Sequence, residues 1–172
     1  LRDHRATNPC AEQPLPPYGC CCLGSINLTL YVKDAFSDKA SFDFAGFGKT
    51  VETSIRMLDN VLEATHWPLE QQHAEAQSKR RVGLGFTGLG NALAMLRLRY
   101  DTDAARVMAT RISEFMRDQA YLASVELARE RGAFPLFNAD MYLSGGNFAS
   151  RLPTEVKDKI RKHGLRNSHL LS

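Results

Sequence analysis

Hydrophobic residues recur at helical spacing over much of the chain. Between residues 42 and 66 an apolar residue appears every three or four positions, which predicts a helix with one buried face. The apolar positions are Phe44, Phe47, Val51, Ile55, Leu58, Val61 and Leu62. Ser41 or Asp43 can cap the start of this helix, and Pro68 ends it. A longer stripe over 103–131 predicts a second helix that begins at Asp101 or Thr102 and ends at Gly132.

Shorter segments fill the remaining chain. Residues 69–78, 91–98 and 154–163 predict three more helices. Residues 25–32 alternate and are rich in β-formers, which predicts a short strand or extended segment, and 165–172 also reads as extended. Residues 138–150 read as a loop. Helices that alternate with short extended pieces favour the α/β class over an all-helical bundle.

Four glycines stand close together at Gly83, Gly85, Gly88 and Gly90, which indicates close backbone approach or a tight turn. Residues 83–88 match the dinucleotide-binding pattern G-x-G-x-x-G. That site requires a buried strand just before the first glycine, and residues 78–82 are mostly polar. The sequence therefore favours tight helix packing beside a turn over a dinucleotide site.

Composition and charge describe an ordinary globular chain. It has 172 residues, 44% of them hydrophobic, with a net charge of +3. The charges are scattered, so we expect no nucleic-acid partner. The densest basic run, residues 79–81, is typical of a solvated face, although it could meet a phosphate.

No apolar run reaches the about 18–20 residues that span a membrane, and the first residues are polar and charged. We therefore expect a cytoplasmic protein without a signal peptide. The first residue is not Met, and both ends read as parts of a longer chain.

All four cysteines lie between residues 10 and 22, and Cys20, Cys21 and Cys22 are consecutive. Secreted disulfide frameworks spread cysteines across the fold instead. Zinc sites need two separated pairs of ligands, and none of the five histidines pairs with these thiols in sequence. The sequence thus predicts no metal site and favours reactive thiols.

Prolines and glycines stiffen the loop around the first cysteine. If its backbone is extended, Asn8, Cys10 and Glu12 project to one face, where an amide, a thiol and a carboxylate could bind one small polar molecule. Residue types alone do not choose between thiolate and thiyl chemistry. The alternative is an inert buried thiol beside a surface carboxylate.

Residues 8–15 read Asn-Pro-Cys-Ala-Glu-Gln-Pro-Leu, Pro17-Tyr18 follow, and Leu-Gly-Ser-Ile-Asn-Leu at 23–28 comes after Cys21 and one further residue. This segment resembles the active-site finger loop of the large, catalytic chain of ribonucleotide reductases, and it is most similar to the adenosylcobalamin-dependent (class II) form. Residues 80–85 with Gly88-Leu89, 126–135 and 166–168 are also similar to that family.

The resemblance implies a role for each loop residue. Cys10 matches the cysteine that becomes a thiyl radical and removes the 3′-hydrogen of the ribonucleotide. Glu12 matches the general base for the 3′-hydroxyl, and Asn8 the amide that holds the ribose hydroxyls. Cys21 matches one member of the redox pair that delivers electrons. The implied substrate-binding residues are Asn8, Pro9, Cys10, Ala11 and Glu12.

Some features depart from the family pattern. Ala11 stands where the family often has Gly, and Cys20 and Cys22 have no family role. The resemblance implies that the redox partner of Cys21, the phosphate-binding loop, the shuttle cysteines and most of the cobalamin-binding surface lie outside this chain. We therefore expect no turnover from the 172 residues alone.

The family fold is a ten-stranded α/β barrel with the finger loop along its centre. The resemblance thus implies that residues 1–172 form a helix-rich part of such a barrel domain, with the finger loop at 8–28 and helical and barrel segments at 42–172. The expected partners are a ribonucleoside diphosphate or triphosphate, a thioredoxin-like or dithiol reductant, and the remaining parts of the parent chain.

Two alternatives remain open. One is the catalytic subunit of a class I reductase, whose radical comes from a second subunit rather than from adenosylcobalamin. The other is a non-catalytic, thiol-rich structural or metal-binding module, for which stoichiometric zinc in the reduced protein would argue.

Overall fold

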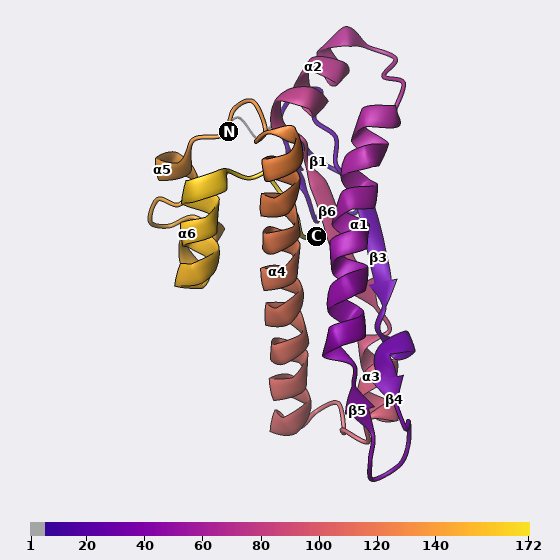
Figure 1. The fold of residues 1–172 in the computed structure, drawn as a ribbon. Helices are drawn as coiled ribbons and strands as arrows, with labels where there is room; N and C mark the ends of the chain where they lie inside the picture. The colour runs from indigo at the N-terminus through magenta and orange to yellow at the C-terminus, as the bar shows by residue number, and fades with distance from the viewer. Residues whose placement is uncertain (1–5) are drawn as a thin grey trace.

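Two long helices form the centre of the molecule. The computed structural model describes residues 6–172, in which α1 (Phe44–Ala64) and α4 (Asp103–Arg131) lie side by side (Figure 1). Asp43 caps α1 by accepting a hydrogen bond from the amide of Gly46 at 3.0 Å, and Thr102 caps α4. Gly132, at a φ of +84°, ends α4. Both helices confirm the periodicity of the sequence.

Shorter elements surround this pair. The helices are α2 (Glu70–Lys79), α3 (Leu89–Met95), α5 (Ala139–Tyr142) and α6 (Thr154–His163), and the 3₁₀ turns are η1 (Leu28–Tyr31) and η2 (Phe148–Arg151). The helices predicted over 69–78 and 154–163 are thus confirmed. The one predicted over 91–98 begins earlier, at Leu89, and the predicted loop over 138–150 contains α5 and most of η2. None of the helices in the described residues is long and apolar enough to cross a membrane.

The main sheet is parallel. Strand β3 (Cys22–Asn27) pairs with β6 (Val82–Thr87) in a register that runs from Cys22 opposite Val82 to Asn27 opposite Thr87. A parallel bridge from Leu84 to Leu171 adds the C-terminal segment to the other edge of β6. Helix α1 connects the two strands in the chain and packs on both. The fold is therefore mixed α/β, but the strands of residues 6–172 close no barrel, so the ten-stranded barrel stays a prediction.

Two short antiparallel pairs complete the strands. Strands β1 (Ala6–Thr7) and β2 (Pro14–Leu15) form a hairpin, and β4 (Val32–Lys33) pairs with β5 (Ser41–Phe42) at the far end of α1 (Figure 1). The strand predicted over 25–32 begins instead at Cys22 and stops at Asn27. There the Asn27 side chain accepts a hydrogen bond from the amide of Thr29, at 3.1 Å, and starts η1.

The glycine-rich segment is mainly a strand rather than a turn, and of the two predicted explanations close approach is the one that holds. Gly83 and Gly85 lie inside β6, and only Gly88, at a φ of +75°, begins a helix. A Cβ atom on Gly83 would stand 2.5 Å from Cδ2 of Leu23 on the neighbouring strand. Gly83 therefore makes room for the side chain of Leu23 on β3, which periodicity does not reveal.

The core lies between α1, α4 and the sheet. Phe47, Val51, Ile55 and Leu62 of the predicted α1 stripe have no exposed surface. Val61 of the same stripe is 44% exposed, so the buried face of α1 is narrower than the set of apolar positions predicted. Ile26, Val82 and Leu84 cover the side of the sheet that faces α1.

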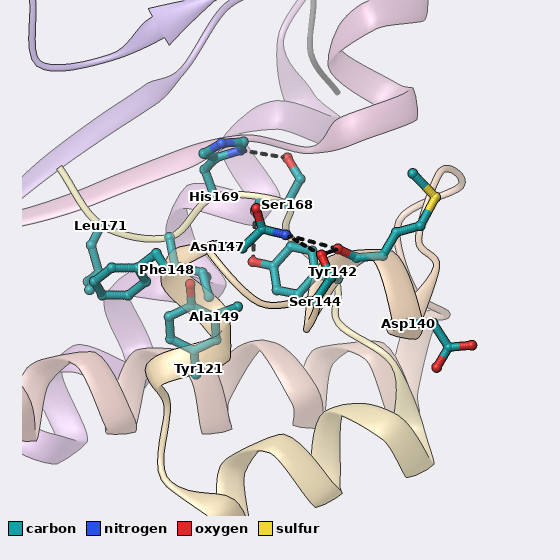
Figure 2. A pocket seen from close by; sticks show the side chains of 12 residues that line it. Tyr121, Asp140, Tyr142, Ser144, Asn147, Phe148, Ala149, Ser168, His169 and Leu171 are labelled. Carbon is teal, nitrogen blue, oxygen red and sulfur yellow. Dashed lines mark hydrogen bonds between the residues drawn. The ribbon is translucent and has the colours of Figure 1, made fainter.

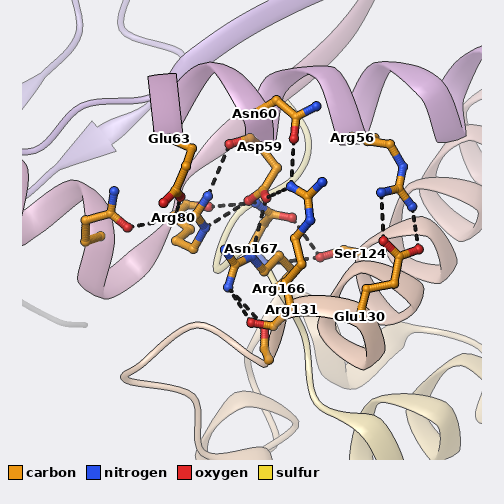
Figure 3. Close-up of polar contacts among 12 residues, drawn as sticks. Arg56, Asp59, Asn60, Glu63, Arg80, Ser124, Glu130, Arg131, Arg166 and Asn167 are labelled. Carbon is orange, nitrogen blue, oxygen red and sulfur yellow. Dashed lines mark hydrogen bonds and ion pairs between the residues drawn. The ribbon is translucent and has the colours of Figure 1, made fainter. Parts of the chain in front are cut away.

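A buried ionic cluster holds four parts of the chain together (Figure 3). The carboxylate of Asp59 on α1 is fully buried and accepts hydrogen bonds at 2.9 Å from Nε of Arg80 and from Nδ2 of Asn167. Its second oxygen accepts from Nη1 of Arg131 at 3.5 Å and from Nε of Arg166 at 3.3 Å. The cluster thus joins α1, the end of α2, the end of α4 and the C-terminal segment.

This cluster contradicts the expectation of a solvated basic run at 79–81. Arg80 is 2% exposed and Arg81 is 3% exposed. Arg80 is buried because Asp59, Glu63 and Gln77 each accept a hydrogen bond from its guanidinium group. Asp59 lies 21 positions earlier in the chain, so a local pattern could not reveal the pairing.

Candidate active site

The hairpin between β1 and β2 carries Asn8, Cys10 and Glu12. The amide of Asn8 donates to the carbonyl of Gln13 at 3.1 Å, and the amide of Ala11 donates to the carbonyl of Asn8 at 2.9 Å. The side-chain oxygen of Asn8 accepts from the amide of Gln13 at 3.0 Å. Asn8 therefore closes the hairpin from both its backbone and its side chain.

The backbone of this loop is not extended, as the sequence reading had assumed. The chain turns at Pro9 and Cys10, and Ala11 has a φ of +65°. The turn nevertheless brings two of the predicted residues together, because Nδ2 of Asn8 donates a hydrogen bond to Oε1 of Glu12. Cys10 is exposed at the tip between them.

The positive φ also explains the residue at position 11. Glycine adopts this conformation readily, whereas a Cβ atom makes it less favourable. The glycine that the family often has at this position is therefore the better fit to the turn, and Ala11 occupies it with some backbone strain.

A buried glutamine fixes the hairpin to the rest of the fold. The side chain of Gln13 is buried, and its Nε2 donates to the carbonyl of Leu171 at 3.0 Å. Leu171 itself bridges to Leu84 of β6. The hairpin is thus attached to the sheet through the C-terminal segment. Sequence reasoning missed Gln13, because only its contact with a residue at the opposite end of the chain shows its role.

The consecutive cysteines are divided between the two faces of β3. Cys20 and Cys22 pack against the hydrophobic core. Cys21 points away from the core, toward Gly83. A Cβ atom added to Gly83 would lie 3.2 Å from Sγ of Cys21. We call this second side the open face of the sheet, formed by Cys21, Leu23, Ser25, Gly83 and Gly85. Leu23 is 47% exposed there.

Burial raises the pKa of the thiols of Cys20, Cys21 and Cys22. For Cys21, burial and, to a smaller extent, the neighbouring thiols Cys22 and Cys20 together raise the pKa from 9.0 to about 12. Arg81 lowers this pKa, whereas the carboxylate of Glu12 raises it. The pKa of Cys20 is raised to about 11, again mainly by burial. Because Glu12 acts on Cys21, the hairpin tip and the open face lie within electrostatic range of each other.

A second concave region lies on the other side of the C-terminal segment (Figure 2). It is a cavity of about 1200 Å³ between α4, α5, η2 and residues 168–171. The hydroxyl of Tyr142 donates to the carbonyl of Ser168 at 2.9 Å and holds this segment in place. The lining contains one carboxylate, Asp140, and no cysteine. The predicted chemistry therefore belongs to the hairpin and the open face.

Metal ligation has no support within residues 6–172. No group of three or more His, Cys, Asp or Glu side chains is placed there to hold an ion. His4 lies outside the described residues. His169 instead shares a hydrogen bond with the hydroxyl of Ser168 at 3.1 Å.

A parallel strand pair backed by helices, with a thiol-bearing hairpin tied to its edge, defines a mixed α/β domain that presents cysteines on an exposed loop and beside its sheet. The model of one family, described as the barrel domain of ribonucleotide reductase, matches residues 2–172. The chain belongs to this family.

Its relatives include proteins named as vitamin B12-dependent reductases and proteins named as reductase large chains. It is 41% identical over 133 residues to the vitamin B12-dependent ribonucleoside-diphosphate reductase of Thermoplasma acidophilum, which is 77% of this chain and 17% of that protein. A protein of the same description from Mycobacterium tuberculosis (strain CDC 1551 / Oshkosh) is 38% identical over 82% of this chain and 20% of its own length. The ribonucleoside-diphosphate reductase large chain of Encephalitozoon cuniculi is 32% identical over 88% of this chain and 20% of its own length. The chain thus spans about a fifth of the length of the curated relatives it matches.

Proposed function

We propose that the protein to which this chain belongs reduces ribonucleotides to deoxyribonucleotides through a thiyl radical at Cys10. The observation that carries the proposal is the hairpin, which holds Asn8 and Glu12 in contact and presents Cys10 between them at an exposed tip. Membership of the reductase family supports the same conclusion.

The proposed reaction divides its steps among Cys10, Glu12, Asn8 and Cys21. The Cys10 thiyl removes the 3′-hydrogen of the ribose, and the Glu12 carboxylate takes the proton of the 3′-hydroxyl. The amide of Asn8 orients Glu12 and holds the ribose hydroxyls. Cys21 supplies reducing equivalents as the 2′-hydroxyl leaves as water. Its raised pKa fits this task, because the thiol stays protonated until it reacts.

The proposed domain is the family barrel, with residues 8–28 as finger loop and 42–172 as helical and barrel segments. In the complete protein the remaining strands would extend the sheet and cover the open face and the hairpin tip. A radical must be shielded from water, and the exposure of Cys10 in this chain fits a surface that other parts of the protein cover.

The names of the first relatives support adenosylcobalamin as the cofactor and a ribonucleoside diphosphate as the substrate. The accessible position of Cys10 fits such a group, which would supply radical chemistry when bound. Orienting the substrate and holding its protons would be left to Asn8, Glu12 and Cys21. A dithiol or thioredoxin-like protein would restore the reduced thiols.

The complete protein, incubated with adenosylcobalamin, a ribonucleoside diphosphate and dithiothreitol but no second subunit, tests this proposal. Formation of deoxyribonucleotide would support the class II assignment. Activity that requires an added radical-generating subunit would instead favour a class I catalytic subunit. The similarity to the large chain of Encephalitozoon cuniculi is compatible with that alternative. No product under either condition would contradict the proposed function.

A further inference from the structure

Arg80 and Arg81, which lie just before β6, differ in their hydrogen-bond partners. Both are almost completely buried. Arg80 donates hydrogen bonds to three side chains and to the backbone carbonyl of Asp59. Within the described residues, Arg81 has no hydrogen-bond partner for any of its three guanidinium nitrogens. A buried cation without such partners is costly, so it stabilises the charged form of any neighbouring group that can become an anion.

Few groups can supply that anion. The groups in residues 6–172 that act on Arg81 electrostatically are Glu75, Cys21 and Cys20. Glu75 already forms an ion pair with Lys79, at 2.5 Å between Nζ and Oε1. Cys20 packs against the core on the other side of the strand. This leaves the thiol of Cys21 as the group on the open face that can become an anion beside Arg81.

The strand register places the two residues next to each other. The amide of Cys22 donates to the carbonyl of Arg81 at 3.4 Å, and Cys22 lies opposite Val82. One position earlier on each strand, Cys21 lies beside Arg81. Residues opposite each other in parallel strands are close neighbours, so a change of charge at one is felt at the other.

We propose that Arg81 is a positioning residue for the redox chemistry of Cys21, and that its guanidinium group stabilises the thiolate of that cysteine. This inference rests on the proposed function for the role of Cys21, but the charge pair itself does not require turnover. Deprotonation of Cys21 would give a thiolate opposite the cation and release one proton to solvent.

The pair matters when a disulfide at Cys21 is reduced. A thiolate of the external dithiol forms a bond to the partner sulfur, the S–S bond breaks, and its electron pair leaves with Cys21 as a thiolate. The second thiolate of the dithiol then attacks the dithiol sulfur of this mixed disulfide, which closes the disulfide of the oxidised dithiol and releases the partner sulfur as a thiolate that takes up a proton. A leaving thiol with a lower pKa leaves faster, so Arg81 would accelerate this step. Cys20, Cys22 and Glu12 also act on Cys21 electrostatically, and all three oppose the thiolate.

Alkylation of Cys21 by iodoacetamide tests the proposal in the complete, reduced protein. The reaction forms a C–S bond to the thiolate and releases iodide, and peptide mass spectrometry assigns the rate to each cysteine. We expect Arg81→Met to slow alkylation of Cys21 by about three- to tenfold at every pH from 7 to 10, because less thiolate is present at each pH. Arg81→Lys should restore most of the rate.

The direction of the change in alkylation rate distinguishes an electrostatic role of Arg81 from a packing role. If Arg81 only packed, its replacement would loosen the site and speed alkylation. A rate in Arg81→Met that equals or exceeds that of the unmodified protein would therefore overturn the proposal. If Arg81→Met does not fold, the alkylation rates of Arg81→Lys, which keeps the charge, and Arg81→Gln, which removes it, provide the same comparison. Arg56→Gln, which removes a surface ion pair with Glu130, is the matched control and should leave the rate unchanged. If Cys21→Ser retained turnover, the proposed role of Cys21 would fail while the charge pair still stood.

Discussion

At the scale of single residues, the surroundings of each polar group decide its task. Arg80 is enclosed by acceptors and holds the fold together, whereas Arg81 lies beside a thiol with no acceptor of its own. The cysteines differ in the same way, since Cys10 is exposed on a turn and Cys21 lies on the open face of a strand. Neighbours in sequence thus have different surroundings, which is why we propose different roles for them.

The two arginines should respond differently to the same substitution. Arg80→Met leaves the buried carboxylate of Asp59 with fewer donors, so we expect it to lower the free energy of unfolding by about 3–5 kcal/mol. Arg81→Met removes a buried charge without hydrogen bonds, whose burial is itself costly, and should leave the free energy of unfolding unchanged or raise it. Urea unfolding followed by circular dichroism measures both. Equal losses in the two variants would contradict this account of the ionic cluster.

The buried thiols predict a loss of stability in alkaline solution. The pKa of Cys21 is about 12 in the folded protein and 9.0 when exposed, so above pH 9 the unfolded chain loses a proton that the folded chain keeps. Its contribution to stability is complete below pH 9 and disappears as the pH rises toward 12. Unfolding measured at pH 8 and pH 10.5 should show a smaller fall in Cys21→Ser than in the unmodified protein. An identical fall would mean that Cys21 is not protonated as described.

At the scale of elements, the helices could be predicted from the sequence and the site geometry could not. Helices α1 and α4 follow from apolar spacing and caps, both of which are local. Strand β6 was missed because its glycines lack strand propensity and because the reason for Gly83, the Leu23 side chain of β3, lies far away in the chain. The hairpin residues were identified, but their arrangement depends on the turn at Ala11 and on a contact between Gln13 and Leu171, far apart in the chain.

The anchor of the hairpin gives a prediction at this scale. Gln13→Leu removes the hydrogen bond to the carbonyl of Leu171 and frees the hairpin to move against the sheet. Since small displacements of reacting groups can cost about 100-fold in rate, we expect kcat of the complete protein to fall by about 10- to 100-fold. Gln71→Leu, on the exposed side of α2, is the matched control. Full activity in Gln13→Leu would show that the anchor does not position Cys10 and Glu12.

At the scale of the whole molecule, the parallel sheet has one covered face and one exposed face. Its parallel strands are covered by helices on one side, while the open face and the hairpin tip are exposed. The segments similar to the reductase family contribute Arg80, Arg131, Arg166 and Asn167 to the cluster around Asp59. Much of the family resemblance outside the hairpin thus reflects how the domain is held together rather than its chemistry.

This organisation predicts that the isolated segment is inactive. A purified chain of residues 1–172, given adenosylcobalamin, a ribonucleoside diphosphate and a dithiol, should form no deoxyribonucleotide. The open face would lack its cover, and Cys21 would lack a redox partner. Chromatographic analysis of the nucleotides provides the measurement, and turnover by this segment would show that the remaining parts of the family barrel are dispensable.

The most direct test of the central claim is deoxyribonucleotide formation by the complete protein with Cys10 replaced by serine. Serine keeps the size of the side chain at the hairpin tip but does not form the thiyl radical. We predict that Cys10→Ser abolishes product formation while nucleotide binding persists, and that Cys20→Ser, in a cysteine packed against the core, retains activity. Product formation by Cys10→Ser at the rate of the unmodified protein would contradict the assignment of Cys10 as the radical cysteine.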